Sequence, residues 1–176
     1  MTFEEKLTNQ EYDRIWQEYC GFLDLDMASY MRRLLEEQMG LWCASPLGKK
    51  ILKDKRPENI EEFRAMVPLT AYEDYADVLL LKKEDMLPDK PIIWIQTTWE
   101  GGKHPIKVAP YTSGMLKTYK NNILTCLMMA TSKGRGSFDI GIGDTFLYGL
   151  APLPYITGLI PLGLSDELHI EFLPPV

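Results

Sequence analysis

Apolar residues return every three or four positions through much of the first ninety residues, which is the spacing of one helix face. The pattern is clearest after Asp26, a residue that can cap a helix start, where the apolar stripe is Tyr30, Met31, Leu34, Leu35, Met39 and Trp42. Similar spacing predicts helices after Asn9, after Ser45, after Asn59 and over Ala71–Leu81. Residues 1–90 are therefore expected to form a mainly helical segment.

The pattern changes after residue 90, where short β-branched and aromatic runs are bounded by glycine and proline. Four strands are predicted, over Ile92–Gln96, Ile106–Ala109, Thr145–Leu150 and Leu168–Phe172. A long helix is expected to follow Thr112 and to cover one face of the sheet. The predicted fold class is thus α/β: a helical N-terminal part packed on a small mixed sheet, with residues 91–176 as the α/β segment of one compact domain.

Composition narrows the classes of protein that fit. The chain has 176 residues, of which 45% are hydrophobic and 25% charged, which is typical of one packed domain. A net charge of −6 with no basic tract argues against a nucleic-acid partner. No apolar run approaches the roughly 18 residues that span a bilayer, so no membrane partner is expected. Three widely spaced cysteines form neither a metal pattern nor a disulfide framework, which predicts free thiols in the cytoplasm.

The stretch between the first two predicted strands has the composition of a phosphate-binding loop. It contains a hydroxyl pair, a glycine pair and two lysines: Thr97, Thr98, Gly101, Gly102, Lys103 and Lys107. Glycines let backbone N–H groups come close to a ligand, hydroxyls donate hydrogen bonds, and lysines carry positive charge. The alternative interpretation is a glycine turn that joins the two strands of a hairpin.

Three further sequence features precede or follow this loop. The segment Val67–Asp74 (Val-Pro-Leu-Thr-Ala-Tyr-Glu-Asp) precedes it, Tyr111-Thr112 follows it before the long helix, and Gly-Asp-Thr-Phe-Leu-Tyr-Gly-Leu-Ala-Pro occupies 143–152. In this order they resemble the N-terminal part of the acyl-adenylate-forming superfamily. The branch that is most similar is the auxin-responsive acyl-acid amido synthetases and their bacterial relatives, with phenylacetate–CoA ligases more distant. The resemblance runs from about Trp16 onward and covers roughly the front third of a family member.

The resemblance implies an ATP-dependent ligase that uses Mg²⁺ to convert a carboxylic acid to an acyl-adenylate and then transfers the acyl group to an amine or thiol. The hydroxyls, glycines and lysines of the loop would hold the ATP phosphates, and Tyr148, Gly149 and Tyr155 would line an acyl pocket. No catalytic or metal-binding residue is assigned within the chain. We expect the remaining residues to lie beyond Val176, so that the chain is inactive alone and associates with that missing part or with itself.

A second hypothesis keeps the ancestry but not the activity. The loop carries a bulky Trp99 and an anionic Glu100, where the family has a threonine and a second hydroxyl residue. An anionic side chain in a phosphate cradle repels the ligand unless it binds a cation or turns away. The chain is then a structural or partner-binding domain with a degenerate nucleotide loop.

Overall fold

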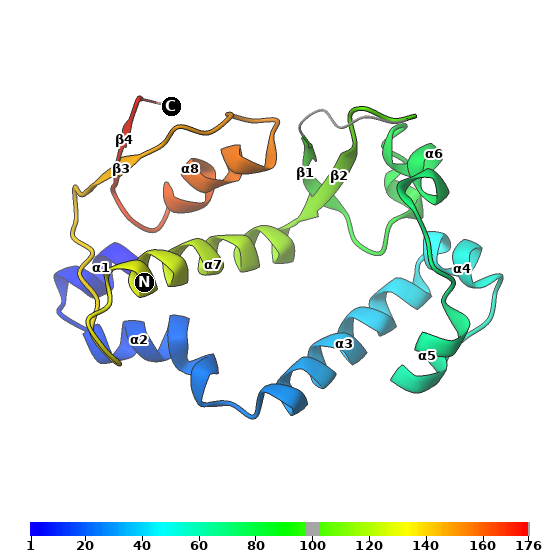
Figure 1. The fold of residues 1–176 in the computed structure, drawn as a ribbon, viewed down its shortest axis with the longest axis horizontal. Coiled ribbons are helices and arrows are strands. Elements are labelled where there is room, and N and C mark those ends of the chain that lie inside the picture. The colour runs from blue at the N-terminus through cyan, green and yellow to red at the C-terminus, as the bar shows by residue number, and fades with distance from the viewer. Residues whose placement is uncertain (98–102, 176) are drawn as a thin grey trace. The chain divides into compact units, whose positions relative to one another are not determined.

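The computed structural model describes residues 1–97 and 103–175. Contacts within the chain divide it into two compact units (Figure 1). Unit 1 is made of Met1–Leu25 together with Ser113–Val176, and unit 2 is the intervening segment Asp26–Thr112. Each unit has its own helices and its own pair of strands, and each is described by itself.

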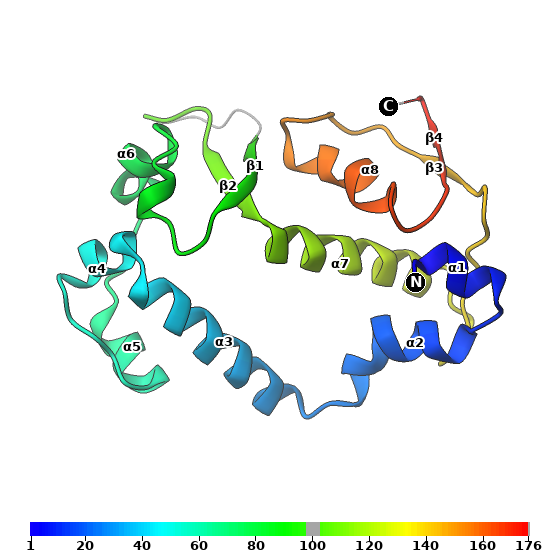
Figure 2. The same ribbon diagram turned by 180° about the vertical axis from the view of Figure 1, so that it is seen from behind.

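Unit 1 joins the two ends of the chain. Its elements are α1 (Phe3–Thr8), α2 (Tyr12–Cys20), a 3₁₀ turn (Gly21–Asp24), α7 (Ser113–Thr131), β3 (Thr145–Leu147), a second 3₁₀ turn (Ile156–Gly158), α8 (Leu159–Leu164) and β4 (Glu171–Leu173). Helix α7 packs against α8 and α2, as both views of the ribbon show (Figures 1 and 2).

Unit 2 consists of short elements around one long helix. They are α3 (Met27–Ala44), α4 (Pro46–Leu52), α5 (Ile60–Met66), a 3₁₀ turn (Tyr72–Asp74), α6 (Ala76–Leu79), another 3₁₀ turn (Glu84–Met86), β1 (Pro91–Gln96) and β2 (Val108–Thr112). Helix α3 packs against α4 and α5, where the Trp42 and Phe63 rings meet edge to face with centroids 5.7 Å apart.

The predicted helix starts at Asp26, Ser45 and Asn59 are confirmed. Each of these side chains accepts a hydrogen bond from a backbone N–H in the first turn of the helix that follows. The helix expected over Ala71–Leu81 is instead a 3₁₀ turn followed by the four-residue α6. The carboxylate of Asp74 accepts from the Ala71 N–H at 2.7 Å and tightens the turn.

The single mixed sheet expected from the sequence is wrong. Within the described residues β1 and β2 form an antiparallel pair, while β3 and β4 form a separate parallel pair. Each strand overlaps its predicted position, but β2 and β4 begin two and three residues later than predicted, and β3 and β4 are only three residues long. Hydrophobic alternation predicts a strand but not its partner, which is decided by the long-range contacts of each unit. The coarser prediction of a mixed α/β protein is confirmed.

A continuous hydrophobic core fills unit 1. It is built from both ends of the chain: Phe3, Leu7, Ile15, Trp16, Tyr19, Cys20, Leu124, Met128, Leu164 and Leu168. The Phe3 and Tyr19 rings pack edge to face at 5.3 Å. Lys6 is buried beside this core, and its ammonium group donates to the Glu18 carboxylate at 2.6 Å. These contacts fasten the first twenty residues to α7 and α8.

Unit 2 buries its apolar residues in smaller groups. Leu47, Leu52 and Ile60 are buried around α4 and α5, and Val78 and Ile95 are buried farther along the chain. None of the described residues of α3 is buried, and Met31 and Leu41 remain 56% and 52% exposed. No helix in the described part of the chain is both long and apolar enough to cross a membrane.

Candidate functional site

The base of the candidate phosphate loop is the β1–β2 hairpin of unit 2. Gln96 lies opposite Val108 in the last paired position of the ladder. One further backbone bond follows, in which the Thr97 N–H donates to the Lys107 carbonyl at 2.9 Å. Thr97 and Lys107 are therefore the last paired residues of the hairpin before the undescribed residues.

Tyr72 ties this hairpin to the segment that precedes it. Its hydroxyl accepts a hydrogen bond from the Val108 N–H at 2.8 Å and lies 3.2 Å from the Val108 carbonyl oxygen, to which it donates. A single side chain thus satisfies both backbone groups of the residue at the foot of the loop. Because the backbone of an edge strand needs partners for its outward N–H and C=O groups, this contact fixes where β2 begins.

The cationic arm of the loop also packs on Tyr72. The Lys107 ammonium lies 5.9 Å from the centroid of the Tyr72 ring, within the range of a cation–π contact. The His104 ring meets the same tyrosine at a centroid distance of 5.9 Å, edge to face. Lys103 is exposed and Lys107 half-buried. Tyr72 consequently organises residues 104–108 as one arm.

The predicted phosphate-binding residues fall into two groups. Thr97, Lys103 and Lys107 are described, and they lie on the two arms at the base of the loop. Thr98, Gly101 and Gly102 lie outside the described residues, as do Trp99 and Glu100. The Thr97 hydroxyl lies 3.4 Å from the Lys107 backbone nitrogen, from which it accepts a weak hydrogen bond across the base. Thr97 therefore helps to hold the two arms together.

The predicted acyl-pocket residues belong to unit 1. Tyr148 is buried, and its hydroxyl donates to the carbonyls of Thr157 and Ala151 at 2.9 and 3.2 Å. Its ring packs edge to face on Phe172 at 5.6 Å. Tyr148 thus anchors the turn between β3 and α8, while Gly149 is exposed and Tyr155 half-buried.

Gly158 makes this turn possible through a close backbone approach. A Cβ atom at this position would lie 2.2 Å from the backbone nitrogen of Leu153, so any larger residue would push the turn apart. The Thr157 hydroxyl donates to the Ala151 carbonyl at 2.6 Å across the same turn. The turn therefore depends on the absence of a side chain at Gly158.

The described residues supply cations for an anionic ligand but no cluster of metal-binding side chains. Among them, no group of three or more histidine, cysteine, aspartate or glutamate side chains is placed to hold a metal ion. Mg²⁺ prefers carboxylate, phosphate and water oxygens. In nucleotide sites this ion takes most of its oxygens from phosphate and water and needs only one or two carboxylates from the protein.

Comparisons with family models, with curated proteins and with solved structures found no match to the chain.

The role of Tyr72 could not be predicted from the sequence. Tyr72 belongs to the Val67–Asp74 segment on which the resemblance rests, but the resemblance assigns no role to its side chain. Nothing in the local pattern indicates that its hydroxyl reaches a residue 36 positions away. A polar aromatic residue in a short segment rich in turn signals is the only hint that the sequence contains.

Proposed function

We propose that the chain is the N-terminal portion of an ATP-dependent acyl-acid adenylating ligase, with the connection between β1 and β2 as its phosphate loop. One observation carries the proposal more than any other. The Tyr72 hydroxyl joins Val108 to the segment Val67–Asp74, so two stretches that bear the family resemblance lie against each other in unit 2. The contact would hold the lysine-bearing arm in one position before the nucleotide arrives.

The chemistry of such a loop is electrostatic. Charge builds on the oxygens of the α-phosphate and pyrophosphate as a carboxylate attacks, and fixed donors lower the barrier because they need no rearrangement. Lys103 and Lys107 would supply positive charge to the phosphates. The hydroxyl groups of Thr97 and Thr98 and the backbone N–H groups of Gly101 and Gly102 would donate hydrogen bonds. A preorganised Lys107 is favoured by its contact with the Tyr72 ring.

The complete reaction needs ATP, Mg²⁺ and a small carboxylic acid, and it produces an acyl-adenylate that an amine or thiol then attacks. We propose that the chain binds the triphosphate but does not complete this reaction alone. The missing groups would come from a further part of the same protein.

A second candidate is favoured by a different observation. Helix α3 buries none of its described residues and exposes Met27, Met31 and Leu41. Exposed apolar side chains along one helix are typical of an interaction surface. The rival proposal is therefore a non-catalytic domain with a degenerate loop that associates with a partner or with a second copy of itself.

Titration calorimetry with ATP and Mg²⁺ separates the two candidates. The ligase proposal predicts heat of binding for the natural chain and its loss in Gly102→Val, because a branched side chain would block close approach of the phosphate. Lys107→Met should weaken binding about tenfold, the effect of one charge-assisted hydrogen bond. Lys90→Met, which removes a lysine just before β1, is the matched control and should leave binding unchanged.

Two outcomes would contradict the ligase proposal. Absence of heat at millimolar ATP would leave the rival, and sedimentation velocity would then test self-association directly. Clear ATP–pyrophosphate exchange by the 176-residue chain would show that it is a complete adenylating unit, against the proposal that it is only the front portion of one.

A further inference from the structure

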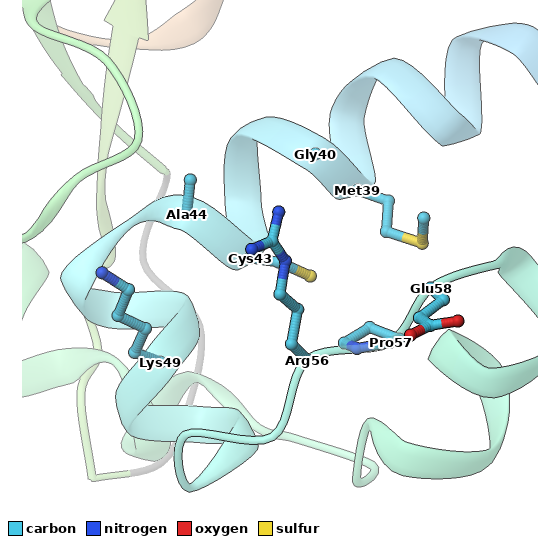
Figure 3. A pocket seen from close by; sticks show the side chains of 8 residues that line it. All are labelled: Met39, Gly40, Cys43, Ala44, Lys49, Arg56, Pro57 and Glu58. Carbon is cyan, nitrogen blue, oxygen red and sulfur yellow. The ribbon is translucent and has the colours of Figure 1, made fainter.

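A hollow of about 680 Å³ lies in unit 2 between α3, α4 and the segment that joins α4 to α5. Its size is within the range of roughly 300–1,000 Å³ that is common for small-molecule sites. Figure 3 shows Met39, Gly40 and Cys43 along the α3 wall, Lys49 on α4, and Arg56 and Pro57 on the connecting segment. None of these residues belongs to the candidate phosphate loop, so the hollow is separate from the proposed nucleotide site.

The cations of the hollow come from two different elements. The Arg56 side chain rises from the connecting segment toward Cys43, and Lys49 extends from α4 (Figure 3). Neither forms an ion pair with any other residue that the structure describes, whereas Lys50, the neighbour of Lys49, pairs with Asp77 at 3.1 Å. The carboxylate of Glu58 also lines the hollow, on the side of Met39 (Figure 3). The lining therefore carries one net positive charge.

The remainder of the lining is apolar or neutral. Met39 is half-buried and Pro57 is buried. Burial raises the pKa of the Cys43 thiol, and the nearby Arg56 charge opposes this less strongly, so the sulfur is protonated and neutral at pH 7. A flexible thioether beside a proline ring and a thiol provides a surface that an aliphatic or aromatic group can cover.

Gly40 is the feature that the fold does not explain. It lies inside the 18-residue helix α3, where glycine is the least favourable residue apart from proline. A Cβ atom built on Gly40 meets nothing within 4 Å, and its φ is not positive, so neither close packing nor backbone conformation requires glycine there. Gly40 lines the hollow, and its lack of a side chain leaves that part of the α3 wall open. Residues that break a local rule without a structural reason are often functional.

We propose that this hollow binds a small organic anion with an apolar body, such as a medium-chain or aromatic carboxylate. The anionic group lies between Arg56 and Lys49, and the apolar body covers Met39 and Pro57 along the wall that Gly40 keeps open. Guanidinium groups bind carboxylates with two parallel hydrogen bonds, which sets the orientation of the ligand. Since Arg56 and Lys49 are both exposed, the site is weak, with dissociation constants in the millimolar range.

A nitrogen–proton NMR titration with sodium hexanoate tests the proposal on the intact chain. Saturable shifts of the Gly40, Cys43 and Arg56 amides are expected at constant ionic strength. Hexanamide lacks the charge and inorganic phosphate lacks the apolar body, and each should bind at least about fivefold more weakly. Equal binding of hexanamide would overturn the role of the cations, and equal binding of phosphate would overturn the role of the apolar wall.

Three variants locate the ligand. Arg56→Gln should weaken hexanoate binding about fivefold, while Arg64→Gln, which changes an arginine on α5 outside the hollow, should leave it unchanged. Gly40→Phe places a ring in the open wall and should weaken binding about tenfold, whereas Gly40→Ala should retain it. Both Gly40 variants should raise the melting temperature by a few degrees, because both replacements favour the helix more than glycine does. A variant that melts higher but binds hexanoate more weakly has lost the site and not the fold. Unchanged binding in Gly40→Phe would overturn the proposal.

Discussion

The two units of this chain use their apolar residues in different ways. Unit 1 gathers them into one core that joins the first twenty residues to α7 and α8. Unit 2 buries fewer of them, leaves α3 without a buried residue among those described, and contains the candidate loop and the hollow. The difference indicates that unit 1 dominates the free energy of unfolding, whereas the candidate binding chemistry lies in unit 2. A change in one unit and a matched change in the other test this division.

The largest expected effect comes from the unit 1 core. Leu124 on α7 is fully buried, and Leu124→Ala should lower the free energy of unfolding by about 2–5 kcal/mol, because it removes buried methyl groups and leaves a cavity. Leu41→Ala on the exposed face of α3 makes the same change in unit 2 and should cost less than about 1 kcal/mol. Urea unfolding followed by circular dichroism measures both. Equal losses would contradict the division between the units.

A smaller difference is expected for the ion pairs. Lys6 is 3% exposed, so Glu18→Gln leaves a buried ammonium group without its anionic partner and should cost about 1–3 kcal/mol. The control is Glu37→Gln, which removes the exposed pair of Glu37 with Arg33 on α3 and should change stability by less than about 0.5 kcal/mol. The same urea experiment measures both variants. A neutral result for Glu18→Gln would show that Lys6 finds another partner or water.

Within unit 2, Tyr72→Phe tests whether the Tyr72 hydroxyl holds Val108 at the start of β2. Loss of the hydroxyl leaves the Val108 N–H and C=O without their partner and should cost about 1 kcal/mol. Hydrogen exchange of the Val108 amide should become faster, and ATP binding at the loop should weaken. Tyr12→Phe, which changes an exposed tyrosine in unit 1, is the matched control. An unchanged exchange rate at Val108 would mean that the hairpin holds its arm without Tyr72.

The smallest expected effect is a loss of stability at acidic pH. Burial acts to raise the pKa of Glu167, but hydrogen bonds from Lys120 and the Phe3 N–H, with the charges of Lys120 and Lys6, lower it below its ordinary value of 4.5. A carboxyl group whose pKa is lowered on folding stabilises the protein above its unfolded pKa, and this contribution is lost as the pH falls through the folded value. Unit 1 should therefore lose stability below about pH 4.5.

The control for this acid effect lies in unit 2. The pKa of Asp77 is also lowered, chiefly by its hydrogen bond with Lys50, but Asp77 is exposed to solvent, which screens its charge. Thermal melts over the acid range, from about pH 3 to about pH 6, should show a flatter profile for Glu167→Gln and an unaltered one for Asp77→Asn. The opposite result would place the acid-sensitive contacts in unit 2.

Local features of the fold could be predicted because their causes are local. Asp26, Ser45 and Asn59 cap their helices since each side chain needs only a backbone N–H about three residues away. The first helix was not predicted although Thr2 and Glu5 form a capping box, because the six residues of α1 are too few for a visible repeat. The candidate loop could likewise be located from its glycine, threonine and lysine residues, because they lie close together in the sequence.

The sequence by itself determined where most of the helices and strands form, since spacing and capping act over a few residues. Tertiary structure alone decided that the strands form two separate pairs, that Tyr72 reaches Val108, and that Gly40 lines a hollow with Arg56 and Lys49. Each of these depends on contacts between residues from different elements of the chain. Such contacts depend on how whole elements pack against one another. The periodicity of residues within a single element therefore does not predict them.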